Sequence, residues 1–185
     1  YYSAIASANQ AIVAIDELGG PETSTALSQA LGEAYLCRAY SHFVLVNMFC
    51  LQYNKQTSAT DLGIPYMTKP ETTLAPHYER GNVADVYAQI EEDLEKGLAL
   101  VGDDNYTVPK YHFNKLAAYA FAARFYLFYE KYDQVIKYAD LCLGSSPSTM
   151  LTDYDVLATM PNGSPQQQPT TLHYVDPSVN ANLLL

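Results

Sequence analysis

Histidine is the first residue type that could do chemistry in this chain, because an imidazole can bind a metal ion or transfer a proton near neutral pH. The four histidines lie far apart in the sequence, at His42, His77, His112 and His173. Neither an HExxH motif nor a Cys-x-x-Cys pair accompanies them, and zinc or iron sites need ligands at such short spacings. We therefore predict no metal site and no cofactor.

Carboxylates are the second group, since two facing carboxylates can hydrolyse a glycosidic bond. The chain has 20 Asp and Glu residues, but the sequence singles out no pair. Its densest acidic cluster falls mostly opposite an apolar helical stripe and consists of Glu91, Glu92, Asp93 and Glu95. We interpret this cluster as a solvated face. The sequence also has no glycine-rich phosphate loop and no G-x-S-x-G elbow. We predict that the protein is not an enzyme, with a helical glycoside hydrolase as an alternative.

Two arginines are unusual because each is the only charge within an apolar helical stretch. They are Arg38 and Arg124. A buried guanidinium must find hydrogen-bond acceptors, since leaving it unpaired in the interior is costly. We predict that both arginines are buried for structural reasons and bonded to a carboxylate such as Asp93 or to carbonyl groups at helix ends. Ligand binding is the less favoured interpretation.

Tyrosine is the remaining group with binding potential, because the chain has 17 Tyr and no Trp. About half of the tyrosines fall on predicted core stripes. Tyr53, Tyr66 and Tyr78 instead lie in a long segment without periodicity, at residues 50–81. A tyrosine ring offers a flat apolar face and a hydroxyl, which suits stacking on a sugar ring or a peptide. We predict these three as ligand-binding residues, with packing of the segment as the alternative.

The elements that must position these residues are helices, and the clearest signal is the segment 114–147. It predicts two short helices broken at Glu130 and Lys131. The first carries two stripes, which are Leu116, Ala120, Ala123, Leu127 and Tyr119, Tyr126, Tyr129, so we expect it to be covered on most sides. The second turns Val135, Ala139 and Cys142 inward and ends at Gly144. The pair is similar to one tetratricopeptide unit, which needs helical neighbours to cover its apolar face.

Three further helices are predicted, at residues 1–18, 25–49 and 82–101. Ser24 or Thr25 caps the second of them and Asn82 caps the third. The sequence thus predicts an all-α fold of tetratricopeptide-like antiparallel helix pairs over residues 1–143, with the long loop 50–81. Residues 144–185 predict an irregular tail with one short strand at 170–175, leading into a further C-terminal part.

Composition limits the partners of the chain. A formal net charge of −10 disfavours nucleic acid and anionic membrane, which both need a basic surface. Charged residues make up only 16% of the chain, which indicates that some apolar surface meets a partner. No apolar run is long enough to span a bilayer. The sequence starts within a helical pattern, so we expect a piece of a longer protein, with any lipid anchor upstream.

Five segments, in this order, resemble the SusD/RagB family of nutrient-binding lipoproteins of Bacteroidetes. The matching positions are Tyr2, Ile5, Ala8 and Asn9; Glu33, Ala34, Arg38, Ala39 and Leu45; Gly63, Ile64 and Pro65; Arg80, Val83, Tyr87, Ile90, Asp93 and Leu94; and Lys115, Ala117, Ala118, Arg124, Tyr126 and Leu127. Together they span residues 1–143, the N-terminal helical part of such a protein. Tyr66 stands where the family commonly has Leu, and Trp is absent.

The resemblance implies an α-rich protein that is lipid-anchored on the outer face of the outer membrane. Such a protein captures glycans, without chemical change, for a SusC-like TonB-dependent transporter. A peptide-binding member of the same family is one alternative. A cytosolic helical-repeat scaffold for protein–protein interaction is another, although such scaffolds use basic clamps in which this chain is poor.

Overall fold

Helices account for nearly all regular structure in the part of the chain that the structure describes. The computed structural model describes residues 1–74, 76–150 and 155. In order, the helices are α1 (Tyr2–Glu17), α2 (Thr25–Phe49), α3 (Val83–Leu100), α4 (Lys115–Phe128) and α5 (Tyr132–Leu143), with 3₁₀ turns at Pro21–Thr23, Pro109–Tyr111 and Pro147–Met150. Within these described ranges, the β-pairing is one isolated antiparallel bridge between Leu62 and Asn82. The predicted all-α class is confirmed, and the predicted strand at 170–175 lies outside the described residues.

Side-chain caps begin three of the helices. Ser24, Asn82 and Asn114 each accept a hydrogen bond from the backbone N–H three residues on, at 3.2, 2.8 and 2.9 Å. This satisfies one of the N–H groups that a helix start leaves without a partner. The predicted starts near residues 25 and 82 are therefore correct.

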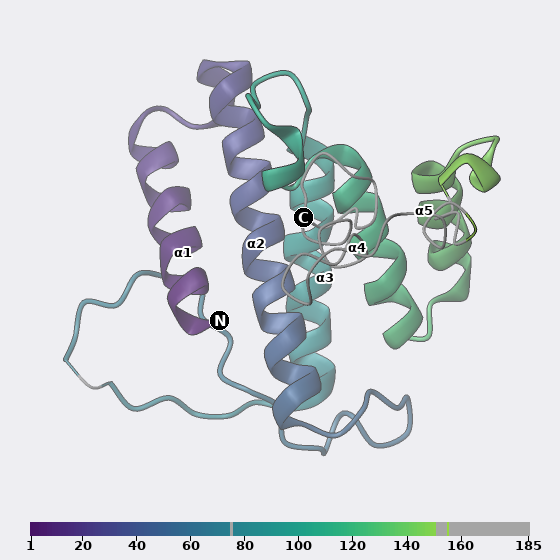
Figure 1. The fold of residues 1–185 in the computed structure, drawn as a ribbon. Coiled ribbons are helices and arrows are strands. Elements are labelled where there is room, and N and C mark those ends of the chain that lie inside the picture. Colours follow the sequence, from purple (N-terminus) through teal and green to yellow (C-terminus); the bar gives the residue numbers. More distant parts are fainter. Residues whose placement is uncertain (75, 151–154, 156–185) are drawn as a thin grey trace, which may run out of the picture.

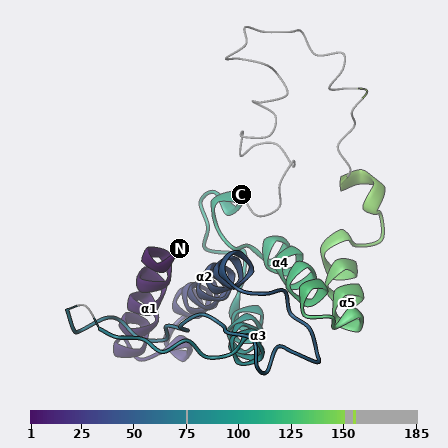
Figure 2. The ribbon, with the colours of Figure 1, turned by 90° about the horizontal axis from the view of Figure 1, so that it is seen from below.

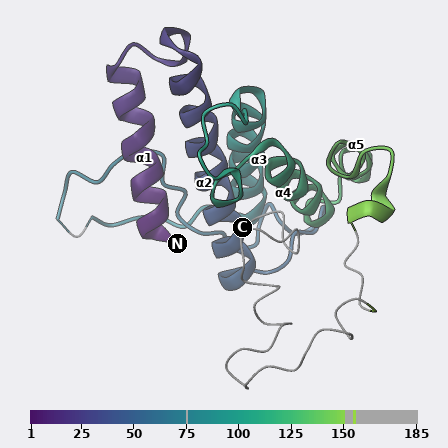
Figure 3. The ribbon, with the colours of Figure 1, turned by 45° about the horizontal axis from the view of Figure 1, so that its top comes forward.

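Helices α2 and α3 form the centre of the fold, and two glycines let them approach closely. A Cβ atom at Gly32 would meet the backbone N of Val101 at 2.6 Å, and one at Gly97 would meet Leu36 at 2.6 Å. Because any larger residue would collide there, the two backbones can lie this near only with glycine at both positions. The views in Figures 1 and 3 show α1 beside α2 on one side of this pair, with α4 and α5 on the other.

Aromatic rings join α4 to the α2–α3 pair. Phe121 and Phe125 of α4 are fully buried. Phe43 of α2 contacts both rings, with centroids 5.7 and 6.0 Å apart, and Tyr87 of α3 stacks on Phe125 at 5.8 Å. Each such pair contributes about 1 kcal/mol beyond the area that it buries. Seen end-on in Figure 2, α4 lies between the central pair and α5.

The outer face of α4 corrects the expectation that this helix is covered on most sides. Leu116 and Leu127 are 42% and 52% exposed, and Ala120 and Ala123 are half-buried. The buried positions of α4 are Ala117, Ala118, Phe121, Ala122, Phe125 and Tyr126. Both predicted stripes are apolar or aromatic, so periodicity alone could not choose the inner face of α4.

Helix α5 packs against α4 and reaches α3 through a shared carboxylate. Tyr138 of α5 stacks on Tyr126 of α4, with centroids 5.6 Å apart. Both hydroxyls donate to Glu95 of α3, at 3.0 and 2.5 Å. Cys142 is buried and Val135 is half-buried, as predicted for the inner side of this helix.

The acidic cluster of α3 is more than the solvated face that was predicted. Three of its four members bond to residues outside α3, and the pairs are Glu91 with Lys131, Asp93 with Arg38, and Glu95 with Tyr126 and Tyr138. Only Glu92 forms its ion pair within the helix, with Lys96 at 2.6 Å. The cluster therefore ties α3 to neighbours on both sides of the fold.

Candidate functional site

The segment from Leu62 to Lys69 is fastened at both of its ends, first to the residues just before α3 and then to side chains of the helices. At the first end, Gly63 N–H donates to Gly81 O at 2.8 Å and Arg80 Nε donates to Gly63 O at 2.6 Å. A Cβ atom at Gly63 would meet Asn82 O at 2.6 Å, so a larger residue would push the segment away from the start of α3.

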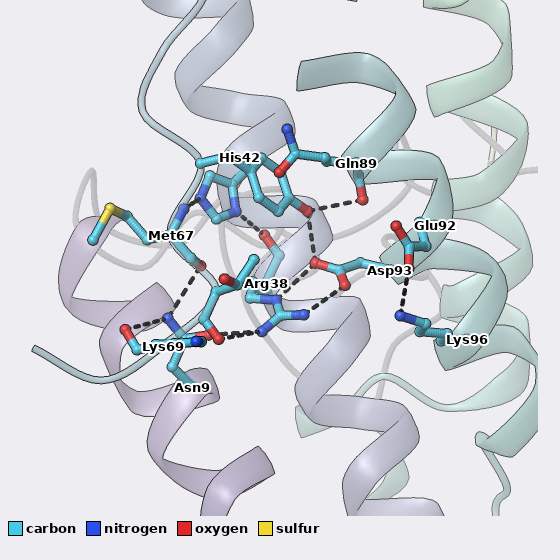
Figure 4. Close-up of polar contacts among 11 residues, drawn as sticks. Asn9, Arg38, His42, Met67, Lys69, Gln89, Glu92, Asp93 and Lys96 are labelled. Carbon is cyan, nitrogen blue, oxygen red and sulfur yellow. Dashed lines mark hydrogen bonds and ion pairs between the residues drawn. The ribbon is translucent and has the colours of Figure 1, made fainter. Parts of the chain in front are cut away.

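A buried polar network fastens the other end. Arg38 of α2 and Asp93 of α3 are 5% and 3% exposed. They form a bidentate ion pair, with Nε to Oδ2 at 2.7 Å and Nη2 to Oδ1 at 2.6 Å. Arg38 Nη1 also donates to Asn9 Oδ1 at 2.8 Å and to the Thr68 carbonyl at 3.2 Å. Burial acts to lower the pKa of Arg38, but its hydrogen bonds and the charge of Asp93 outweigh burial and raise that pKa. Figure 4 shows these groups converging between three helices.

His42 completes the network. Its ring is fully buried, Nδ1 lies 2.9 Å from the Arg38 carbonyl, and Nε2 lies 3.0 Å from the Met67 amide nitrogen. These partners fix a neutral tautomer, because the carbonyl needs the N–H of Nδ1 and the amide needs the lone pair of Nε2. Burial lowers the pKa of His42 to about 4. Tyr66 stacks on the ring at 3.7 Å and donates to Asp93 Oδ2 at 2.6 Å.

A cavity of about 350 Å³ opens between α1 and the fastened segment. Helix α1 contributes Tyr2, Ile5, Ala6 and Asn9 to its wall, and the segment and its continuation contribute Pro65, Met67, Lys69, Glu71 and Tyr78. Tyr2 and Tyr78 are 44% and 39% exposed. This volume is within the range of small-ligand pockets, about 300 to 1,000 Å³.

The structure separates the three tyrosines that the sequence grouped as ligand-binding residues. Tyr78 lines the cavity, and both Tyr66 and Tyr78 line a second hollow of about 230 Å³ beside it. Tyr66 is half-buried, with its hydroxyl held by Asp93. Tyr53 packs against Tyr87 and Tyr129, with centroids 5.0 and 4.7 Å apart. Its ring is therefore engaged in the aromatic core, away from the cavity.

The two arginines also differ in their surroundings. Arg38 is buried and paired with Asp93, whereas Arg124 is exposed, which corrects the expectation that it is buried. Arg124 lies on the outer side of α4, whose inner face the sequence did not distinguish.

Sequence reasoning missed three residues of this site, which are Tyr2, Asn9 and His42. Asn9 and His42 did carry a signal. The positions three and four residues before and after Asn9 are all apolar, and so are three of the four such positions around His42, with Arg38 as the fourth. A polar side chain in a core needs bonding partners. Tyr2 is exposed and carried no comparable signal.

Neither a metal centre nor a membrane span is found among the residues that the structure describes. No group of three or more His, Cys, Asp or Glu residues in that part of the chain converges on a possible ion site. None of its helices has the length and apolar character needed to cross a bilayer.

The helix pairs, the fastened segment and the cavity define an all-α scaffold that holds a ligand-sized hollow at one end. The sequence profile of SusD-like proteins, described as starch-binding and associating with the outer membrane, matches residues 1–127. This chain belongs to that family, and the predicted SusD/RagB resemblance is confirmed.

Individual relatives agree with this assignment. A SusD-like protein, P38, of Formosa agariphila is 30% identical over 138 residues, which are 72% of this chain and 23% of that protein. A SusD superfamily protein of Bacteroides thetaiotaomicron is 25% identical with a TM-score of 0.67, over 78% of this chain and 30% of that one. A laminarin-binding SusD-like protein shares the fold at 24% identity and a TM-score of 0.62, over 78% of this chain and 28% of that one. The chain spans less than a third of the length of these relatives.

Proposed function

We propose that this protein binds oligosaccharides at the cell surface and delivers them, chemically unchanged, to a SusC-like TonB-dependent transporter. Membership of a starch-binding family that associates with the outer membrane carries the proposal. A lipid anchor N-terminal to residue 1 would hold the protein at the outer membrane. No cofactor enters this function.

The cavity beside α1 is the ligand site in this proposal. Tyr2 and Tyr78 present partly exposed rings at its wall, and such rings can stack on the C–H face of a sugar. Tyr66 contacts the ligand through the second hollow. The hydrogen bonds of Asn9 and Arg38 hold the wall in place before a ligand arrives, which lowers the entropy lost on binding.

Titration calorimetry of the full-length protein with laminarin and starch oligosaccharides tests the ligand half of the proposal. Tyr78→Ala should weaken binding by about fivefold, because a stacked ring contributes on the order of 1 kcal/mol. Tyr111→Ala is the matched control, since Tyr111 is 68% exposed on another element, and it should leave affinity unchanged. Absence of glycan binding, tight binding of peptides instead, or release of hydrolysis products would each overturn the proposal.

The exposed apolar side chains of α4 and α5 support the second half of the proposal, which is delivery to a transporter. Leu127 and Ile136 are 52% and 62% exposed, and apolar patches on a protein surface commonly mark contact sites. Copurification from outer membranes should recover a barrel transporter with the full-length protein. Ile136→Glu should reduce that recovery while glycan affinity stays the same. Recovery of no barrel partner would contradict delivery to a transporter.

A further inference from the structure

The inner wall of the cavity beside α1 has no free polar side chain that could bond to a sugar hydroxyl. This wall consists of Ile5, Ala6, Asn9, Pro65 and Met67. Ile5, Ala6, Pro65 and Met67 contribute apolar side chains to it. Asn9 is the polar residue of the inner wall, and it is 1% exposed.

The amide of Asn9 is already occupied. Its two N–H groups donate to the carbonyls of Met67 and Lys69 at 3.1 and 3.2 Å, and its oxygen accepts from Arg38 at 2.8 Å. The Tyr2 hydroxyl also has a partner within the protein, the Pro65 carbonyl at 3.4 Å. The Asn9 side chain therefore serves the fold and is not available to a ligand, whereas the Tyr2 hydroxyl at the mouth can still accept a hydrogen bond.

The apolar character of the inner wall determines which part of a glycan can enter the cavity. A sugar ring placed inside would lose the hydration of its hydroxyls without gaining hydrogen bonds, and each such loss weakens binding by about tenfold. A methyl or acetyl group has little hydration to lose and gains from burial. The volume of about 350 Å³ is ample for such a group, since a cavity of roughly 150 Å³ lined by apolar side chains admits benzene.

The mouth of the cavity, unlike its inner wall, carries exposed charged side chains. Lys69 and Glu71 are exposed charged side chains that line it, and both can bond to sugar hydroxyls that stay in water. The exposed rings of Tyr2 and Tyr78 lie on α1 and on the segment, respectively. Sugar rings are thus better accommodated at the mouth than inside.

We propose that the cavity beside α1 selects glycans that carry short apolar substituents, such as O-acetyl groups, and encloses the substituent while the sugar rings rest at the mouth. This inference rests on the proposed function and specifies its ligand class.

Matched pairs of neutral glycans test the inference. Acetylated oligosaccharides of xylan and of glucomannan are compared with the same preparations after alkaline deacetylation, by titration calorimetry with the full-length protein. At least one acetylated preparation should bind about tenfold more tightly than its deacetylated form, from the burial of one acetyl group.

Two substitutions on α1 test whether the preference for acetylated glycans arises in the cavity. Ala6 and Ala4 are both exposed on α1, but only Ala6 lines the cavity. Ala6→Leu puts an isobutyl group in place of a methyl group at the cavity wall and should reduce the preference for the acetylated glycan. Ala4→Leu makes the same change outside the cavity and should keep the preference. Melting temperatures of both variants equal to that of the native protein establish that neither effect comes from unfolding.

The outcomes separate this inference from the proposed function. Equal affinity for acetylated and deacetylated glycans, or a preference that Ala6→Leu leaves unchanged, overturns the inference and leaves glycan binding intact. Binding of unsubstituted starch or laminarin oligosaccharides, with no binding of acetylated glycans, also overturns the inference and leaves glycan binding intact. Tighter binding of a leucine-containing hexapeptide than of any glycan overturns both.

Discussion

Acid should destabilise this protein through one buried residue, His42. In the fold its neutral ring donates to the Arg38 carbonyl and accepts from the Met67 amide. A proton on Nε2 removes the acceptor for Met67 and adds a positive charge close to the Arg38 guanidinium. Asp93 is the nearby carboxylate, and its two oxygens are already bonded to Arg38 and Tyr66. The folded state therefore resists protonation of this ring.

The size of the effect follows from the two pKa values of His42. The pKa is about 4 in the folded protein and about 6.5 in an unfolded chain. Because the unfolded chain binds the proton first, the free energy of unfolding is unaffected above pH 6.5 and decreases as the pH falls from 6.5 to 4. The difference between the two pKa values, at about 1.4 kcal/mol per unit, predicts a total loss of about 3 kcal/mol. Below pH 4 both states are protonated and the loss stops growing.

Urea unfolding between pH 4 and 8 measures this loss. The comparison is between the native sequence and His42→Gln, whose side chain does not titrate in this range. Other titrating groups are common to both proteins, so their contribution cancels in the difference. The stability advantage of the native sequence over the variant should shrink by about 3 kcal/mol between pH 7 and pH 4. A difference that stays constant with pH would refute the reasoning.

Two further predictions concern the backbone. Glu130 has a left-handed conformation, with φ of 58°, which costs a residue with a side chain about 1 kcal/mol, so Glu130→Gly should stabilise the protein by about that amount in urea unfolding. Gly97→Ala should destabilise it by about 2 kcal/mol, because overpacking a core costs energy of this order and the new Cβ would meet buried Leu36 at 2.6 Å.

Gly81→Ala is the control for the second change. A Cβ atom at Gly81 meets nothing within 4 Å, so stability should stay within about 0.5 kcal/mol of the native protein. A Gly97→Ala variant as stable as this control would contradict the close approach of α2 and α3. Loss of stability in Glu130→Gly would show that the left-handed turn between α4 and α5 is not strained.

The helices could be predicted from the sequence because their signals are local. Ser24 and Asn82 cap the helices that they were expected to cap, and Gly144 ends α5 with φ of 62°. The long segment was correctly placed, since prolines and a loss of periodicity mark it. These features depend on residues within one or two turns of each other.

The site could be predicted only in part, because its contacts join residues far apart in the chain. Arg38 and Asp93 are 55 positions apart and Asn9 and Met67 are 58 apart. The sequence marks Arg38 as a charge in an apolar helical stretch, but it does not say which distant side chain or backbone carbonyl each polar residue meets. The same reason explains why Tyr53 and Tyr78 were grouped, since closeness in sequence does not decide whether a ring packs inward or lines a cavity.

The close approach of α2 and α3 also affects the polar network of the candidate site, which does not include the two glycines. Asp93 lies one helical turn before Gly97, so the spacing that the two glycines permit also determines whether Asp93 can reach Arg38. Arg38 in turn orients Asn9 and the Thr68 carbonyl. The distance between α2 and α3 therefore affects the shape of the cavity beside α1, and a substitution at either glycine should change the ligand specificity that we propose for this cavity.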